Sequence, residues 1–169
     1  MAVDGVSRVL FVCLGNICRS PTAHGVFESL VRQRGLTDRV EVDSCGTSGW
    51  HVGEAPDSRS TEEAARRGYT LGSLRGRQVR ATDFLTFDYI LAMDRQNMQD
   101  LRTLSPDDYS GHLGLFLDFA ENVDIREVPD PYYGGDDGFS HVLDLIEAAS
   151  EGLVRELHRQ WDSREDAAR

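Results

Sequence analysis

Two cysteines, an arginine and a serine lie within residues 13 to 20, in the stretch "VLFVCLGNICRSPTA" that covers residues 9–23. If the segment between Cys13 and Arg19 curls, its backbone N–H groups point inward and form a nest for a tetrahedral anion. The same amides stabilise a thiolate, and the Arg19 guanidinium binds two phosphoryl oxygens with its planar fork. These residue types at this spacing predict a thiolate nucleophile directed at a phosphorus atom.

The residues between and after the two cysteines fit such a nest. Gly15 permits a positive φ, and Asn16 tolerates one better than most residues do. The Ser20 hydroxyl is placed to donate a hydrogen bond to the Cys13 sulfur. The predicted phosphate-binding loop therefore comprises Leu14, Gly15, Asn16, Ile17, Cys18 and Ser20, together with Cys13 and Arg19.

A nucleophile of this kind needs a proton donor for the leaving group, and Asp130 in "VPDPYYGG" is the best candidate. A proline on each side restricts the backbone, so the carboxylate is presented on a stiff loop. Tyr132 and Tyr133 follow directly, and with Trp50 they are predicted to wall a deep, flat pocket. Taken alone, such a segment is more often a turn than a site; the cysteine loop favours the site.

The elements around the first motif place it where an α/β protein binds ligands. Residues 9–12 form a continuous apolar run that predicts a strand buried on both faces of a parallel sheet. A helix follows, which Ser20 is predicted to cap, with Pro21 in its first turn and Gly35 at its end. Ligands of open parallel sheets bind beyond the carboxyl ends of the strands, where this motif lies.

The rest of the chain continues to alternate between strands and helices. The predicted elements are a strand at 39–44, a capped helix with a glycine stop at 57–68, a strand at 89–93, a helix opened by Asp94, a less certain strand at 113–117 and a last helix from about Phe139 to Trp161. This alternation predicts an α/β fold with a parallel sheet.

Length and composition predict one soluble cytoplasmic domain that spans residues 1–169. No apolar run approaches the roughly 18 residues that cross a bilayer, and no signal peptide is recognisable, so no membrane partner is expected. Three cysteines, an odd number, fit a reducing compartment. Since no long apolar stripe is left over once the core is assigned, a monomer or a weak dimer is expected.

The net charge of −11 argues against nucleic-acid binding. One segment reverses the sign, because residues 66–80 hold five arginines and no acid. A solvated surface is the simpler interpretation of this segment, and a basic rim that attracts anionic ligands is the alternative.

The motifs "VCLGNICRSP" and "DPYYGG", with "DSCGTSGWHVGE" and "MDRQN" between them, closely resemble the low-molecular-weight protein tyrosine phosphatases. The resemblance covers nearly the whole chain. It implies a three-layer, doubly wound sheet of four parallel strands with helices on both faces, of the flavodoxin-like or Rossmann-like kind. It also implies phosphotyrosine proteins as substrates, inhibition by phosphate-like oxyanions, and hydrolysis without a metal or other cofactor.

The resemblance implies roles for single residues as well. Cys13 attacks phosphorus, Arg19 clamps the phosphate, and Asp130 acts first as acid and then as base. Asn16 and Ser44 match positions that brace the loop through hydrogen bonds. Cys18 matches a cysteine that bonds to the nucleophile on oxidation and so protects it reversibly.

The sequence departs from the family pattern at a few positions. Cys45 stands where alanine is frequent and is interpreted as a small buried packing residue. Leu74 stands where many relatives carry a histidine of the bracing network, so the bracing is expected to be weaker or differently connected. His24 stands where an acid is common, and we expect a surface helix residue with no catalytic duty or, alternatively, one that modifies the electrostatics of the pocket mouth.

Three other functions compete with tyrosine phosphatase activity. A branch of the family acts on phosphoarginine, but commonly has threonine where this chain has Ile17 and reduces the aromatic pair that follows the acid. An arsenate reductase needs further cysteines in the segment "ATDFLTFDYI", which has none. A non-catalytic phosphate-binding module would lack the nucleophile, the arginine or the acid, and all three are present.

Overall fold

A single parallel sheet carries the predicted motifs at one of its ends. The computed structural model describes residues 5–131 and 136–168. The strands are β1 (Ser7–Cys13), β2 (Val40–Gly46), β3 (Tyr89–Ala92) and β4 (His112–Leu115). They lie side by side in the order β2-β1-β3-β4, and each neighbouring pair is parallel. The prediction of an α/β fold with four parallel strands is confirmed.

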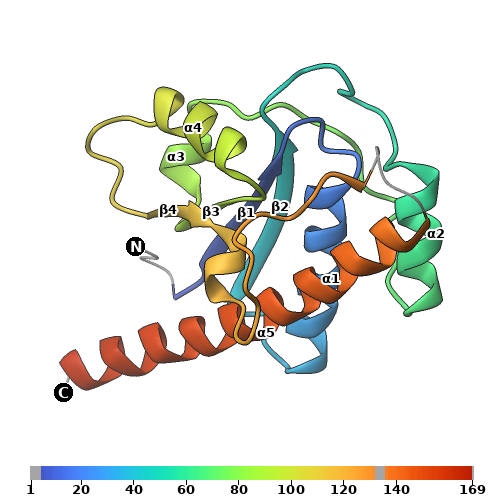
Figure 1. Cartoon of the computed structure of the whole chain (residues 1–169). Helices are drawn as coiled ribbons and strands as arrows, with labels where there is room; N and C mark the ends of the chain where they lie inside the picture. The colour runs from blue at the N-terminus through green and yellow to red at the C-terminus, as the bar shows by residue number, and fades with distance from the viewer. Residues whose placement is uncertain (1–4, 132–135, 169) are drawn as a thin grey trace.

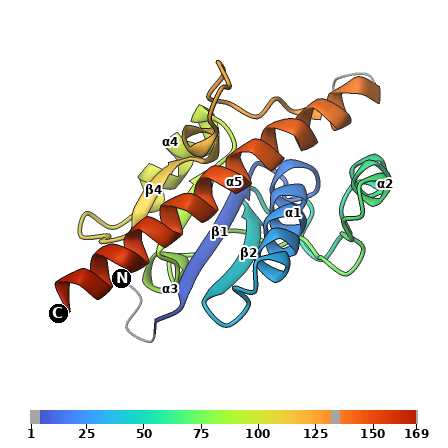
Figure 2. The same ribbon diagram turned by 90° about the horizontal axis from the view of Figure 1, so that it is seen from below.

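Helices cover both faces of this sheet, as Figures 1 and 2 show. The helices are α1 (Arg19–Gln33), α2 (Ser58–Arg66), α3 (Asp83–Thr86), α4 (Arg95–Leu104) and α5 (Asp136–Ala167), with the short 3₁₀-helix η1 (Phe116–Phe119) after β4. Helices α1 and α5 lie on one face, and α3 and α4 lie on the other. Helix α2 lies at the periphery, next to the N-terminal end of α5 (Figure 1).

The central strand β1 is buried on both faces because its side chains point alternately into two cores. Val9 and Phe11 are fully buried in the core under α1 and α5. Leu10 and Val12 are fully buried in the second core, under α3 and α4. The two cores hold β1 rigidly, so its carboxyl end at Cys13 is a fixed platform for the segment that follows.

The start of α1 differs from the prediction by two residues. Cys18 is the N-cap, no side chain caps the helix, and Ser20 lies inside the first turn. The prediction that Ser20 caps α1 is wrong because its hydroxyl points to the segment after β1 instead. The helix ends as predicted, since Gly35 has a φ of +68°, in the left-handed region where glycine costs least.

The C-terminal half of the chain shows two further differences. The predicted strand at 113–117 is shorter, because Phe116 and Leu117 turn into η1 and are fully buried under α5. Helix α5 extends beyond the predicted limits at both ends. Residues spaced three or four apart along its inner face are all buried: Val142, Ile146, Ala149, Leu153, Leu157 and Trp161. No helix among the described residues has the length and apolar character to cross a membrane.

Candidate active site

Cys13 ends β1, and its sulfur faces back into the turn that leads to α1. The Cys13 Sγ lies 3.0 Å from the Ser20 Oγ, and the backbone N–H of Asn16 donates to the same sulfur at 3.3 Å. The side chain is buried, with only 3% of its surface exposed. A sulfur with a hydroxyl and a backbone amide aimed at it is a site where negative charge is stabilised.

Asn16 is the internal brace of this turn. Its φ of +58° is in the left-handed region, which asparagine occupies more readily than most residues. Its Nδ2 donates to the Ser20 Oγ at 2.8 Å, and its Oδ1 accepts from the backbone N–H of Arg77 at 3.0 Å. The Ser20 hydroxyl has one proton, which it donates either to the Cys13 sulfur or to the Cys45 carbonyl oxygen 3.2 Å away.

The residues that follow β2 hold the same turn from outside. The backbone N–H of Thr47 donates to the Cys13 carbonyl, and that of Ser48 donates to the Leu14 carbonyl, both at 2.9 Å. Gly46 allows this close approach, because a Cβ atom there would lie 2.7 Å from the Leu14 oxygen and 3.1 Å from the Asn16 nitrogen. The turn is therefore fixed before any ligand arrives.

Arg19 is anchored by two groups on its far side. Its Nη1 donates to the Asp94 Oδ2 at 2.6 Å and to the Val128 carbonyl at 3.0 Å, and only 4% of the residue is exposed. Burial lowers the pKa of the guanidinium, but the negative charges of Cys13 and Asp94 more than offset this and raise it. Arg19 is therefore a permanent cation aimed at the turn.

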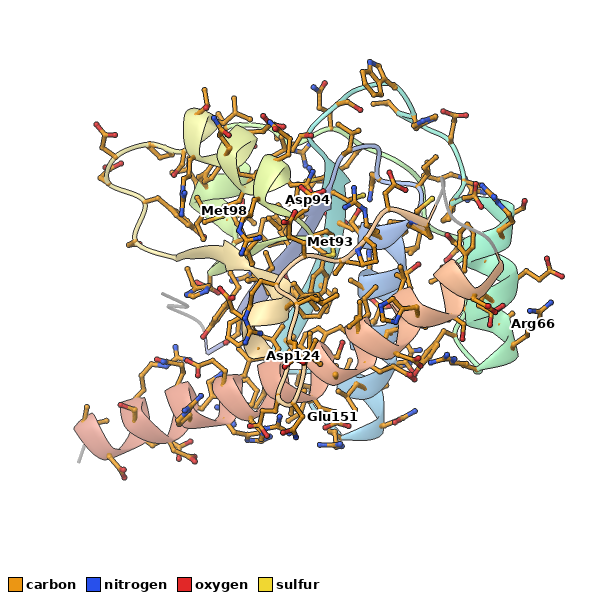
Figure 3. The ribbon with its side chains drawn as sticks, viewed as in Figure 1. Arg66, Met93, Asp94, Met98, Asp124 and Glu151 are labelled. Atoms are coloured by element: carbon orange, nitrogen blue, oxygen red, sulfur yellow. The ribbon has the colours of Figure 1, made fainter. Side chains whose placement is uncertain are left out.

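Asp94 has a second role as the N-cap of α4, in a reciprocal capping box with Asn97. Figure 3 labels Asp94 beside Met93, just beyond the end of β3. The sequence predicted Asp94 only as a helix start; its contact with Arg19 needed the order of the strands, which places the ends of β1 and β3 side by side.

These groups line a pocket of about 260 Å³ above the end of β1. Its lining residues are Cys13, Leu14, Gly15, Ile17, Cys18, Arg19, Trp50, His51 and Asp130. The structure thus brings the predicted nucleophile, cation and acid to one cavity from segments far apart in the sequence. Trp50 lies at the mouth with 73% of its surface exposed, whereas the predicted walls Tyr132 and Tyr133 lie outside the described residues.

His51 is a pocket residue that sequence reasoning missed. Its Nδ1 lies 2.6 Å from the Glu54 Oε2, and its ring covers Gly15, where a Cβ atom would lie 3.0 Å from the imidazole Cδ2. Gly15 does not have a positive φ, so its role here is steric: it has no side chain, which leaves room for the His51 ring. The signal in the sequence was the spacing of His51 and Glu54 in a loop already suspected of lining the pocket.

Cys18 lies in the same pocket but in a different electrostatic environment. Burial raises the pKa of its thiol to about 12, while a hydrogen bond from the Ser60 side chain acts in the opposite direction. The thiol is therefore protonated at neutral pH. One residue earlier, the Ile17 carbonyl accepts a hydrogen bond from the backbone N–H of Asp57 at 2.8 Å, which ties the loop to the start of α2.

His24 is buried rather than on the surface, so that expectation is wrong. Only 7% of it is exposed, and its Nδ1 lies 3.0 Å from the Ser44 Oγ. Its Nε2 faces Glu28 at 3.4 Å. Ser44 was expected to brace the loop, but its hydroxyl contacts His24 instead. This contact connects α1 to β2, one helical turn after Ser20.

The arginine-rich segment is a solvated surface in part, since Arg66 and Arg80 are exposed, but it does not form a basic rim of the pocket. Arg67 pairs with acids of α5, and Arg77 pairs with Asp43 and Asp83. Among the described residues that line the pocket there is no arginine from this segment. The described residues also contain no group of three or more His, Cys, Asp or Glu side chains arranged to hold a metal ion.

Comparison with known proteins gives a consistent result. The family model described as low molecular weight phosphotyrosine protein phosphatase matches residues 8–163. The low molecular weight phosphotyrosine protein phosphatase of Schizosaccharomyces pombe is 45% identical over 151 residues, covering 89% of this chain and 96% of that protein.

Two solved structures extend the comparison to the fold. A protein tyrosine phosphatase from Entamoeba histolytica, with Hepes in its active site, superposes with a TM-score of 0.88 at 42% identity, covering 91% of this chain and 98% of that one. The Drosophila arginine phosphatase DARP superposes with a TM-score of 0.82 at 32% identity, covering 88% and 96%.

Proposed function

The chain belongs to the low molecular weight phosphotyrosine protein phosphatase family, and on that premise we propose that it hydrolyses phosphotyrosine in proteins with Cys13 as the nucleophile. The Cys13 thiolate forms a bond to phosphorus while the bond from phosphorus to the phenolic oxygen breaks, and Asp130 gives that oxygen a proton. Water then attacks the cysteinyl phosphate and gives its proton to Asp130. Inorganic phosphate leaves, and the thiolate is restored.

The observation that carries this proposal is the convergence of Cys13, Arg19 and Asp130 on one pocket. In phosphoryl transfer the protein acts mainly by positioning and by charge stabilisation. The permanent cation of Arg19 suits the equatorial oxygens of the transferred group, and the Asn16 amide stabilises the Cys13 sulfur. In this proposal Asn16 and Ser20 keep the loop in shape, and Ser44 contributes indirectly through His24.

We favour phosphotyrosine over phosphoarginine because of the apolar groups around the pocket. Ile17 and Trp50 offer flat or bulky apolar surface to an aromatic ring and no acceptors to a guanidinium. In this proposal Tyr132 and Tyr133 complete the wall. Rates on matched peptides that carry either phosphotyrosine or phosphoarginine test the choice, and a faster phosphoarginine reaction would reverse it.

Cys18 is proposed as the redox partner of Cys13, because both side chains line the same pocket. Peroxide converts the Cys13 thiolate to a sulfenic acid, and the Cys18 sulfur then bonds to the Cys13 sulfur and displaces the hydroxyl as water, which forms a disulfide before oxidation goes further. Reversible inactivation by peroxide, lost in Cys18→Ser, is the expected behaviour. We further propose a single phosphatase domain over residues 1–169 that is monomeric or weakly dimeric, acts in the cytoplasm and is inhibited by phosphate-like oxyanions.

The decisive experiment is Cys13→Ser measured with a phosphotyrosine peptide. The substitution keeps the size of the side chain but removes the thiolate, so hydrolysis is lost while binding of the peptide is retained. Thr47→Ser, next to the loop but with its backbone contact unchanged, is a suitable control. Hydrolysis that persists in Cys13→Ser would contradict the mechanism.

A further inference from the structure

Arg67 fastens the C-terminal end of α2 to the N-terminal part of α5. Its Nη1 lies 2.6 Å from the Glu147 Oε1 and 2.8 Å from the Asp144 Oδ1. Its Nη2 donates to the Ser140 Oγ at 2.8 Å and to the Ser140 carbonyl at 3.1 Å. Ser140, Asp144 and Glu147 are spaced four and three residues apart, so they lie on one face of α5, and a single guanidinium binds all three over successive turns.

Neighbouring residues support the same contact. Gly68, with a φ of +88°, ends α2 and turns the chain, which leaves Arg67 as the C-cap facing α5. Tyr69 donates from its hydroxyl to the second oxygen of Glu147 at 2.5 Å. Near the start of α2, the Arg59 guanidinium lies 4.8 Å from the centre of the Phe139 ring. The start of α5 is thus clamped along its side by α2 and the turn that follows it.

The start of α5 lies next to the segment that carries the proposed acid. A Cβ atom on Gly138 would lie 3.8 Å from both the Cα and the Cβ of Pro131, so a gap of only about methyl size separates the first turn of α5 from this proline. Pro131 is buried, and it immediately follows Asp130, which lines the pocket. A displacement of this turn toward Pro131 closes that gap and pushes on the residue next to Asp130.

Helix α2 also touches the other half of the site. The Asp57 backbone, at its N-cap, donates to the Ile17 carbonyl of the phosphate-binding loop. One end of α2 is thus tied to the loop with the nucleophile, and the other end, through Arg67, is tied to the helix behind the acid. The distance between loop and acid depends on both attachments.

We propose that Arg67 is a positioning residue that sets the location of Asp130 relative to the phosphate-binding loop. The inference rests on the proposed function, because it concerns the proton that Asp130 gives to the leaving group. Arg67 touches neither substrate nor reacting atoms and acts through Ser140, Asp144 and Glu147. A displacement of about 1 Å in a catalytic group lowers rates by about 10²-fold, so loosening this clamp has a large kinetic effect.

The test uses the dependence of the rate on the leaving group. Phosphotyrosine releases a weakly acidic phenol that needs a proton, whereas p-nitrophenyl phosphate releases a more acidic phenol that needs one much less. In Arg67→Ala we expect kcat/KM on phosphotyrosine to fall about 10- to 100-fold and that on p-nitrophenyl phosphate to fall less than about threefold. Asp130→Asn calibrates the assay, with the same selectivity and a larger loss.

Arg66→Ala is the matched control. Arg66 is next to Arg67 in the sequence, but it extends outward from α2 (Figure 3) and pairs with Glu62 and Glu63 of its own helix. Its removal is expected to leave both rates unchanged. Arg67→Lys keeps a charge without the fork, so it should restore part of the phosphotyrosine rate. If Arg67→Ala does not fold, Glu147→Gln weakens the same contact from the α5 side. It is expected to show the same selective loss of kcat/KM on phosphotyrosine, but a smaller one.

The possible outcomes of this experiment can be distinguished. A selective loss on phosphotyrosine, with the vanadate inhibition constant of the wild type retained, supports the assignment. Equal losses on both esters, or no loss on either, overturn it, because a residue that only stabilises the fold cannot distinguish leaving groups. A wild-type protein that hydrolyses neither ester overturns the proposed function itself and the inference with it.

Discussion

Arg19 is held 2.6 Å from Asp94, and the same carboxylate caps α4, so one side chain both orients the phosphate-binding cation and starts a helix. Substitutions at Asp94 separate these two roles, because asparagine caps a helix about as well as aspartate does but carries no charge.

We expect kcat/KM on phosphotyrosine to fall about tenfold in both Asp94→Asn and Asp94→Ala, since in both Arg19 loses a charged anchor. The free energy of unfolding should fall by a further ~1 kcal/mol only in Asp94→Ala, which also loses the cap. Steady-state kinetics and urea unfolding of the two variants check this. If kcat/KM fell only in Asp94→Ala and stayed close to wild type in Asp94→Asn, Asp94 would matter only as a helix cap.

The close approach of Gly46 to the loop gives a second prediction. A methyl group there would meet the Leu14 backbone oxygen at 2.7 Å, so in Gly46→Ala the loop itself must shift. We expect a loss in kcat/KM of about 10²-fold. Gly15→Ala is the matched control: its methyl group would lie 3.0 Å from the His51 ring and 3.7 Å from the Ile17 side chain, and side chains, unlike the backbone, can turn away. A larger loss in Gly15→Ala than in Gly46→Ala would contradict this account.

The cysteines should differ in reactivity. Burial raises the pKa of Cys18 to about 12 and also raises that of Cys45, so neither thiol ionises near pH 8, where an unperturbed thiol with a pKa of 9.0 begins to. Alkylating agents attack thiolates. With iodoacetate at pH 8, peptide mapping should find Cys13 modified first, and added inorganic phosphate should protect it. Modification of Cys18 or Cys45 at a comparable rate in the folded protein would be evidence against these assignments.

The pair formed by His24 and Glu28 predicts a dependence of stability on pH. The hydrogen bond from His24 lowers the pKa of Glu28 below its ordinary value of 4.5. A depressed carboxyl pKa contributes stability above that ordinary value, and the contribution disappears as pH falls through the lower folded-state pKa. The side chain is 45% exposed, so solvent screening limits the effect to less than about 1 kcal/mol.

The measurement is urea unfolding of the wild type and of Glu28→Gln at pH 7 and at pH 3. The difference between the two proteins should be present at pH 7 and should shrink at pH 3. A difference that stays constant with pH would mean that the charge of Glu28 does not contribute.

The sequence was informative where function depends on neighbours along the chain. Cys13, Asn16 and Arg19 lie in one turn, so their types and spacing alone predicted an anion site, and the apolar run before them predicted a buried strand. Asp130 could be proposed from its two flanking prolines. Its arrival in the same pocket could not be derived from the pattern, and came from the resemblance.

Two contacts that sequence reasoning missed, those of Asp94 and His24, act across the sheet. Asp94 reaches Arg19 only because β3 is the neighbour of β1. His24 becomes buried because Ser44 on β2 lies opposite its face of α1. The misplaced cap at Ser20 has a similar cause: its hydroxyl bonds to Asn16 and Cys45 rather than to its own helix. Local propensity cannot foresee such long-range partners.

Helix α5 has a consequence for the order of events during synthesis. Its first turn lies next to the residue after Asp130, while near its other end the Trp161 indole donates to the Ser7 hydroxyl at the beginning of β1, at 3.0 Å. The nucleophile leaves the ribosome well before the helix that completes the architecture. We therefore expect a nascent chain to remain inert toward phosphate esters until α5 has been made, and a premature stop codon before Trp161 should yield a polypeptide that carries the whole cysteine turn without a complete active site around it.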